Sequence, residues 1–356
     1  MHEGLTLAGR YRVGHCLAQG GMGEIYAGTR LGTGTRAERE VAIKVLQRNY
    51  AADPRAADGL AREAAFLAML AHPHVVRLLD FGYCAEGAPF LILERLHGRD
   101  LGEVVSATGP ISPLRLLPIV HRLCEALASA HEQGFVHGDI KPANVMLGRS
   151  PDYLAGVRLL DFGLARFFRS EGGQLCSSPL LGTPAYMAPE LITGMPDAPD
   201  GRTDQFSLAA LVYVALTGRE PFVGHTPGEV LTRVRHDNPR PLCLYETRSG
   251  EGGDAEAEIE RVVRRGMAKR PCDRYPTVRA FARALDRAIA DWARVRDVGR
   301  CGPRPALRPT SGLARRRLAR APMSRSALAQ AETIPLVIPQ AGPRAGSPAG
   351  FVREAS

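Results

Sequence analysis

The sequence predicts an α+β protein of two lobes, a small β-rich N-terminal lobe with one helix and a larger helical C-terminal lobe. Short alternating strand patterns fill the first hundred residues, and apolar residues at helical spacing follow Leu101. After residue 298, Gly, Pro, Arg and Ala dominate without a sustained period, which is typical of disorder. We therefore expect a folded part at 11–296, divided near 95/96, and a disordered tail at 297–356.

The N-terminal lobe is expected to hold five strands and one helix. A glycine turn separates the first two strands, and the third strand alternates strongly. Residues 55–70 then switch to apolar residues at helical spacing. The expected strands are 11–18, 24–29, 40–47, 75–82 and 89–96.

The C-terminal lobe is expected to rest on three long helices. Residues 203–218 are apolar all round, the pattern of a helix buried in the middle of a lobe. Residues 278–297 are amphipathic and close the folded part. The remaining helix, 112–134, is expected to carry on one face Leu114, Leu117, His121, Cys124, Leu127 and His131.

The composition excludes membrane, secreted and disulfide-stabilised classes. The chain is 45% hydrophobic and 23% charged, as in ordinary soluble proteins. Seven cysteines without a CxxC pair indicate reduced thiols in a cytoplasmic protein. No secretory signal opens the chain, and the longest apolar stretch, 207–216, is shorter than the ~20 residues that span a bilayer.

The net charge of +9 is concentrated in the tail. From Gly299 onward there are ten Arg and two Glu, a balance of +8, which leaves +1 for the first 298 residues. This distribution argues against a uniformly basic nucleic-acid-binding surface. We interpret the tail as a solvated linker; the alternatives at this point are tail-borne nucleic-acid binding and a patch for acidic partners.

Two of the three lysines of this chain lie in short motifs. Only three of the 46 basic residues are Lys, and one of them is Lys44 in "VAIK". On the helix at 55–70, Glu63 lies within a stripe of leucines, and a buried carboxylate needs a partner. We predict a Lys44–Glu63 pair aimed at phosphates; the alternative is a lysine that extends its stem along the sheet into solvent.

Further motifs supply the other groups that phosphoryl transfer requires. "HGDIKPANVML" at 137–147 contains Asp139, Lys141 and Asn144, and "LLDFGLA" places Asp161 after an apolar strand. Carboxylate and amide oxygens suit Mg²⁺, and a point charge suits the transferred phosphate. The glycines of "AQGGMGEIY" at 18–26 indicate either a phosphate-binding loop or a plain β-turn.

Taken together, these motifs resemble the eukaryotic-like bacterial Ser/Thr protein kinases over about residues 11–296. The resemblance implies the bilobal protein-kinase fold and transfer of the γ-phosphate of Mg-ATP to Ser or Thr hydroxyls of proteins, including autophosphorylation. The motifs in order are "AQGGMGEI", "VAIK", Glu63, "HGDIKPAN", "DFG" at 161–163, "APE" at 188–190 and "TDQFSLAALVY".

The resemblance also implies a role for each motif residue. Asp139 accepts the substrate proton, Lys141 neutralises the moving phosphoryl group, and Lys44 holds phosphates beside Glu63. Asn144 and Asp161 bind Mg²⁺, with Mn²⁺ as the alternative ion. Nucleotide contacts are implied for Leu17, Ala18, Gly20, Gly21, Gly23, Ile25, Ala42, Lys44, Leu93, Glu94, Leu96 and Met146.

Other residues take structural roles in this resemblance. His137 packs under Phe162 instead of carrying protons, and Thr183 lies near the catalytic Asp and Lys. The resemblance further implies a buried Glu190–Arg274 ion pair and hydrogen bonds from the catalytic-loop backbone to Asp204. For the basic tail it adds two alternatives to a solvated linker, autophosphorylation at Ser324 or Ser326 and a pseudosubstrate.

The chain departs from the family pattern at two positions. Ala18 replaces the first glycine of the loop, which weakens the expected nucleotide contact. Gly138 stands where many regulated kinases have Arg, so we expect activity that does not depend on phosphate in the segment 164–182. The alternatives are an ATP-binding pseudokinase scaffold and a small-molecule phosphotransferase. The first is expected to lack Lys44, Asp139 or Asp161, and the second to lack "GTPAYMAPE".

Overall fold

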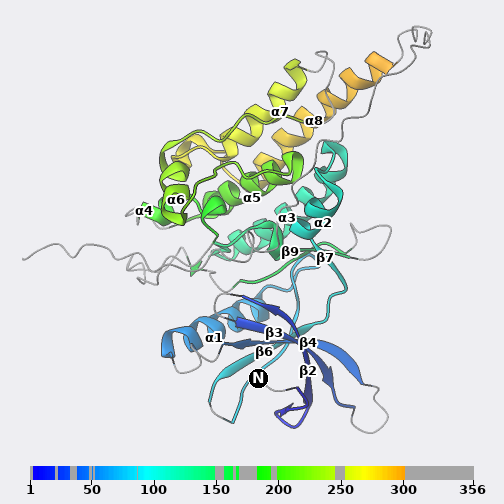
Figure 1. Cartoon of the computed structure of the whole chain (residues 1–356), viewed down its shortest axis with the longest axis vertical. Coiled ribbons are helices and arrows are strands. Elements are labelled where there is room, and N and C mark those ends of the chain that lie inside the picture. Colours follow the sequence, from blue (N-terminus) through cyan, green and yellow to red (C-terminus); the bar gives the residue numbers. More distant parts are fainter. Residues whose placement is uncertain are drawn as a thin grey trace, which may run out of the picture.

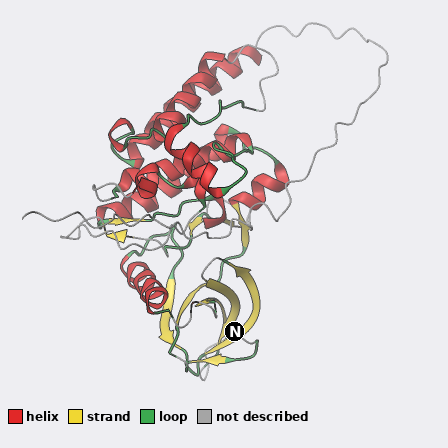
Figure 2. Ribbon diagram, turned by 60° about the vertical axis from the view of Figure 1, so that its left-hand side comes forward, coloured by secondary structure: helices red, strands yellow, loops and turns green. Residues whose placement is uncertain are grey.

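The computed structural model has the two lobes that the sequence predicts (Figure 1). A curled sheet with one helix forms the N-terminal lobe, and helices form nearly all of the C-terminal lobe (Figure 2). The structure describes residues 3–20, 23–32, 38–47, 50, 53–85, 87–148, 156–162, 166–167, 183–193, 199–244 and 253–300. The serines at 170, 177 and 178, and the tail beyond Arg300, lie outside the described residues.

A six-stranded antiparallel sheet forms the N-terminal lobe, with the strand order β1-β2-β3-β4-β6-β5. Its two faces are covered differently: α1 packs against β6 and β5, and a separate apolar cluster around Tyr11, Ile43 and Phe90 fills the other side. The bounds are β1 Thr6–Leu7, β2 Tyr11–Gln19, β3 Gly23–Arg30, β4 Arg39–Leu46, α1 Pro54–Met69, β5 Leu78–Tyr83 and β6 Pro89–Glu94.

The C-terminal lobe is built around α5 (Gly201–Thr217), in which every residue from Thr203 to Thr217 is buried. Asp200 caps its first turn by accepting a hydrogen bond from the backbone N–H of Arg202 at 2.7 Å. The other helices are α2 Leu101–Thr108, α3 Pro113–Glu132, α4 Pro189–Thr193, α6 Pro227–His236, α7 Gly253–Gly266 and α8 Val278–Arg300.

Short strands and single-turn helices, most of them between α3 and α5, carry the polar motifs. Strand β9 pairs with both β7 and β10, and β8 pairs with β11. The strands are β7 Gly98–Asp100, β8 Phe135–Val136, β9 Val145–Gly148, β10 Arg158–Leu159 and β11 Arg166–Phe167; the 3-10 turns are Pro142–Asn144, Pro184–Tyr186 and Pro271–Asp273.

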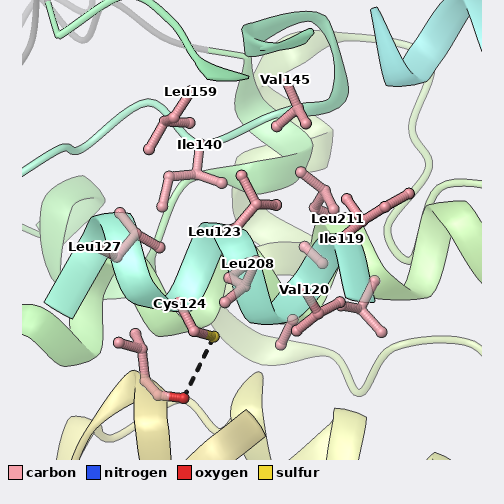
Figure 3. Close-up of a cluster of buried hydrophobic side chains, with 14 of the residues drawn as sticks. Ile119, Val120, Leu123, Cys124, Leu127, Ile140, Val145, Leu159, Leu208 and Leu211 are labelled. Carbon is pink, nitrogen blue, oxygen red and sulfur yellow. Dashed lines mark hydrogen bonds between the residues drawn. The ribbon is translucent and has the colours of Figure 1, made fainter. Parts of the chain in front are cut away.

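Apolar side chains from α3, α5 and the motif-bearing strands form one continuous core. Figure 3 shows Leu123 and Leu127 of α3 beside Ile140, Leu159 and Leu208. The thiol of Cys124 donates to the carbonyl of Val278 at 3.5 Å, which joins α3 to the start of α8 (Figure 3). The segment that bears Asp139 is therefore fixed through Ile140 to the centre of the lobe.

Two details of the sequence-based expectation need correction. The expected face of α3 lies at the edge of the buried surface: Leu114 is 56% exposed, whereas Leu116, Ile119 and Leu123 are fully buried. The reason is that α5 and α8 both pack on α3. The buried surface of α3 is therefore wider than the expected face and is rotated relative to it. The strand expected at 75–82 begins only at Leu78, because Val76 hydrogen-bonds Leu159 of the other lobe instead. Within the described chain, no helix combines the length and apolarity needed to cross a membrane.

Candidate active site

Strand register places Lys44 on the side of the sheet that faces the helical lobe. Lys44 pairs with Leu91 on one side and with Ile25 on the other. Its ammonium contacts both carboxylate oxygens of Glu63 and Oδ1 of Asp161, each at 2.7 Å. The predicted Lys44–Glu63 pair is therefore present, and it includes a second carboxylate from the other lobe.

Contacts within this triad favour the charged forms of Lys44 and Asp161, whereas burial raises the pKa of Glu63. Glu63 is 3% exposed, so its carboxylate depends on Lys44 for compensation. Burial alone would lower the pKa of Lys44, but Asp161 and Glu63 outweigh burial and raise it. Burial would likewise raise the pKa of Asp161, but contact with Lys44 outweighs burial and holds that pKa well below its usual range. Asp161 also has a left-handed backbone, with φ of +58°.

The catalytic-loop candidates form a second, directly linked group. Lys141 Nζ lies 2.8 Å from Asp139 Oδ2. The Asn144 amide donates to the backbone carbonyl of Asp139 at 2.8 Å and to its Oδ2 at 3.1 Å. Burial raises the pKa of Asp139, with Lys141 opposing the shift and the negative charge of Asp161 adding to it. The structure thus brings together Lys44, Glu63, Asp139, Lys141, Asn144 and Asp161; we call these six residues the polar cluster.

His137 packs against Phe162 next to the polar cluster, as predicted. Its ring is fully buried, 4.3 Å from the ring of Phe162. Nδ1 accepts the backbone N–H of Asp139 at 3.2 Å, so the proton is on Nε2, which donates to the Leu160 carbonyl at 3.0 Å. Both ring nitrogens are occupied, so His137 is not available as a general base.

Asp204 fixes the backbone just before the candidate base. Its buried carboxylate accepts the N–H groups of His137 and Gly138, both at 2.9 Å, which confirms the prediction. His131 Nε2 lies 2.7 Å from the same carboxylate, a contact that sequence reasoning missed. Gly138 has φ of +78°, a conformation that glycine adopts without strain. The chain therefore turns sharply into Asp139 at low conformational cost.

Thr183 lies beside Asp139, as expected. Together with Gly138, Tyr186 and Met187, these two residues line a small cavity. The segment before Thr183 lies outside the described residues. The segment after it is anchored by the predicted buried ion pair, in which Arg274 Nη2 lies 2.7 Å from Glu190 Oε2.

The implied nucleotide contacts come mainly from the sheet above the polar cluster. Ala42 is paired with Leu93, and Ala18 with Ile25, so these four side chains lie on adjacent strands. Leu17, Glu94 and Leu96 are partly exposed, and Met146 of β9 lies in the other lobe. The N–H of Gly20 donates to the carbonyl of Gly23 at 2.8 Å. Gly21 lies outside the described residues.

The oxygen donors of Asn144 and Asp161 fit a hard divalent cation. The nitrogen of the Asn144 amide is used by Asp139, which leaves the amide oxygen for a ligand role. No group of three or more His, Cys, Asp or Glu side chains in the described part of the chain could hold a metal. Mg²⁺ is commonly held by one or two protein oxygens together with substrate phosphates, so this donor pair suits it.

Sequence comparison relates this chain to bacterial kinases. Residues 11–282 match the protein kinase domain family. A probable serine/threonine-protein kinase of Corynebacterium efficiens is 35% identical over 285 residues, which is 79% of this chain and 41% of the relative. PknB of Mycobacterium tuberculosis, a serine/threonine-protein kinase, is 34% identical over 276 residues, 76% of this chain and 41% of PknB. The chain thus matches about two fifths of the length of these relatives.

Structural comparison agrees with the sequence comparison. The crystal structure of the Mycobacterium tuberculosis PknI kinase domain matches with a TM-score of 0.61 and 29% sequence identity. The match covers 82% of this chain and 99% of the PknI domain. The curled sheet and the helical lobe therefore have the same arrangement in both chains.

Proposed function

This chain belongs to the protein kinase family, and on that premise we propose that it transfers the γ-phosphate of ATP to Ser or Thr hydroxyls of proteins, itself included. The observation that carries the proposal is the polar cluster, in which two ammonium groups and the oxygens of Asp139, Asn144 and Asp161 meet between the lobes. We assign the activity to a domain at about 11–296, with its lobes divided near 95/96.

In this proposal each residue of the polar cluster has one task. Lys44, fixed by Glu63, binds the phosphates of ATP. Asp139 orients the substrate hydroxyl and accepts its proton, and Lys141 balances the charge of the phosphoryl group as it moves. Asn144 and Asp161 would hold Mg²⁺ or Mn²⁺, which neutralises phosphate charge when bound.

Mass spectrometry after incubation with Mg-ATP and a generic basic protein tests the proposal. We expect phosphate on Ser or Thr of the added protein, of this chain, or of both. An ATP-binding scaffold would bind nucleotide and leave every hydroxyl unmodified. A small-molecule phosphotransferase would modify an added aminoglycoside and neither protein, and that result would contradict the proposed substrate class.

Replacing Lys44 by Arg should lower kcat/KM, by up to about 100-fold, although the positive charge remains. The ammonium already has three oxygen contacts at 2.7 Å, and a longer planar guanidinium cannot keep them in place. Steady-state transfer assays measure the loss. Lys269→Arg is the matched control, because Lys269 lies over the Phe222 ring in the helical lobe and touches none of the polar cluster. If Lys44→Arg keeps the same kcat/KM as Lys269→Arg and the wild type, the proposed role of Lys44 is refuted.

A further inference from the structure

The turn between α5 and α6 carries Glu220, a residue that neither the family roles nor the polar cluster uses. It follows Thr217, the last residue of α5, by three positions. The backbone on both sides of Glu220 is fixed: Thr217 Oγ1 accepts the N–H of Arg219 at 3.2 Å, and the Pro221 carbonyl accepts the N–H of Arg240 at 3.3 Å. The Glu220 side chain is therefore presented from a well-defined turn.

Glu220 has no partner within the described part of the chain. Its carboxylate is partly buried and makes no hydrogen bond or ion pair to a described residue, and burial raises its pKa without opposition from a described cation. Burial also raises the pKa of Glu63, Asp100 and Asp139, but each of these carboxylates accepts a hydrogen bond. A partly desolvated charge without a partner costs free energy. Of these four carboxylates, Glu220 is therefore the one left to pair with a group from outside the chain.

Tyr186 connects the Glu220 turn to the cavity beside Asp139. The 3-10 turn Pro184–Tyr186 packs against both α5 and α6, the two helices that the Glu220 turn joins. Burial and the negative charge of Glu220 together raise the pKa of Tyr186, so this carboxylate lies within electrostatic reach of the phenol. Tyr186 also lines the cavity that Asp139 and Thr183 share. A substrate segment that brings its hydroxyl to Asp139 therefore comes close to Glu220.

We propose that Glu220 is a specificity-determining residue that binds an Arg side chain of the protein substrate close to the acceptor Ser or Thr. This inference rests on the proposed function, because it requires an acceptor hydroxyl at Asp139. Arg suits the site better than Lys, because its planar fork can bind both oxygens of one carboxylate and its charge is more weakly hydrated. An extended peptide advances ~3.3 Å per residue, and a single side chain, that of Tyr186, reaches both the cavity and Glu220. We therefore expect the Arg within about three residues of the acceptor.

Initial rates of transfer from Mg-ATP to Ser peptides test the proposal on the full chain. Each peptide carries one Arg, at a position between three residues before and three residues after the Ser, and the reference peptide has Ala at all of these positions. We expect one position at which Arg raises kcat/KM about tenfold over the reference, the usual effect of one charge-assisted hydrogen bond. In Glu220→Gln, which keeps the shape of the side chain and removes its charge, this ratio should fall to about one.

Charge reversal separates recognition from a structural effect. Glu220→Arg should prefer a peptide with Glu at the same position over the peptide with Arg, because the signs of the pair are exchanged. The matched control is Glu132→Gln, since Glu132 already pairs with Arg279 on the exposed surface of the helical lobe. The Arg preference of this variant should equal that of the wild type.

Three outcomes would overturn the role of Glu220. One is a wild-type chain without an Arg preference at any tested position. Another is an Arg preference that survives in Glu220→Gln, including the case in which the Arg peptide and the reference peptide lose activity equally. The third is transfer to the added basic protein but to no peptide, because recognition would then lie outside the residues around the acceptor. A wild-type chain that modifies neither protein nor peptide would instead refute the proposed function, and the inference with it.

Discussion

Asp139→Asn is expected to lower kcat by about 10²- to 10⁴-fold, the usual contribution of a positioned general base. The Asp139 carboxylate is anchored through one oxygen, Oδ2, which accepts from both Lys141 and Asn144. An Asn side chain can turn its own oxygen toward these two donors, so the fold of the loop should survive. The atom left for the substrate is then an amide nitrogen, which cannot accept a proton at neutral pH.

The pH dependence of the transfer rate is a second test of the role of Asp139. Burial raises the pKa of Asp139, and only its ionised form accepts a proton. Activity should therefore be lost as the pH falls through the raised pKa of Asp139, at a higher pH than an ordinary carboxylate would give. In Asp139→Asn, the residual activity should lose this acidic limb. Rate measurements between pH 4 and pH 8, with circular dichroism to check at each pH that the chain is folded, would show both effects.

Asp58→Asn is a suitable control, since Asp58 is exposed on α1. Its kcat should equal that of the wild type. ATP affinity should be nearly unchanged in Asp139→Asn, because Lys44 and Glu63 are untouched. If Asp139→Asn keeps near wild-type turnover, another group accepts the proton and the proposed mechanism is wrong.

The polar cluster could be predicted from the sequence because each of its parts leaves a local signal. Glu63 stands out as a carboxylate within a stripe of leucines, and Lys44 as a rare lysine in a strand built for burial. The order of Asp139, Asn144 and Asp161 then matches one kind of chemistry. The fold class follows from the change from strand to helix periodicity near Leu101, and the structure confirms it.

Contacts that depend on three-dimensional packing left no such signal. Gln47, whose amide donates to the carbonyl of Gly20, reads as an ordinary polar residue at a strand end, and Gly20 becomes its neighbour only when β2, β3 and β4 associate. His131 fits a helical face equally well with or without Asp204 beside it. The sequence-based prediction places the buried face of α3 wrongly for a related reason: α5 and α8, which lie far along the chain, cover α3. Periodicity identifies a helix but not the number of its neighbours.

Arg274→Met is expected to lower the free energy of unfolding by about 3–5 kcal/mol, the typical cost of removing one partner of a buried ion pair. The Arg274 side chain is fully buried and binds both carboxylate oxygens of Glu190 at 2.7–2.8 Å. It also donates to three backbone carbonyls, those of Arg202, Ala268 and Lys269. Methionine fills similar space, but it leaves the buried Glu190 carboxylate without its guanidinium partner and three carbonyls without this donor.

Chemical denaturation followed by fluorescence measures this loss directly. Trp292 is the single tryptophan and is buried in α8, so its emission reports unfolding of the helical lobe. Arg294→Met is the control: Arg294 pairs with Asp291 on the exposed side of α8, and its loss should cost less than about 1 kcal/mol. Equal losses in the two variants would show that the Glu190–Arg274 pair does not brace the lobe.

The double variant Glu190→Met/Arg274→Met separates the ion pair from the packing around it. Removing both charges eliminates the uncompensated carboxylate, so the double variant should be more stable than Arg274→Met alone. It should not recover wild-type stability, because the three carbonyls and Thr203, which donates to Glu190 at 2.9 Å, still lose their partners.

Glu190 is the last residue of the "APE" motif, which directly follows Met187 in the segment that also holds Thr183 and Tyr186. Transfer activity should therefore fall in both variants before the lobe unfolds, since the same anchor holds the cavity beside Asp139.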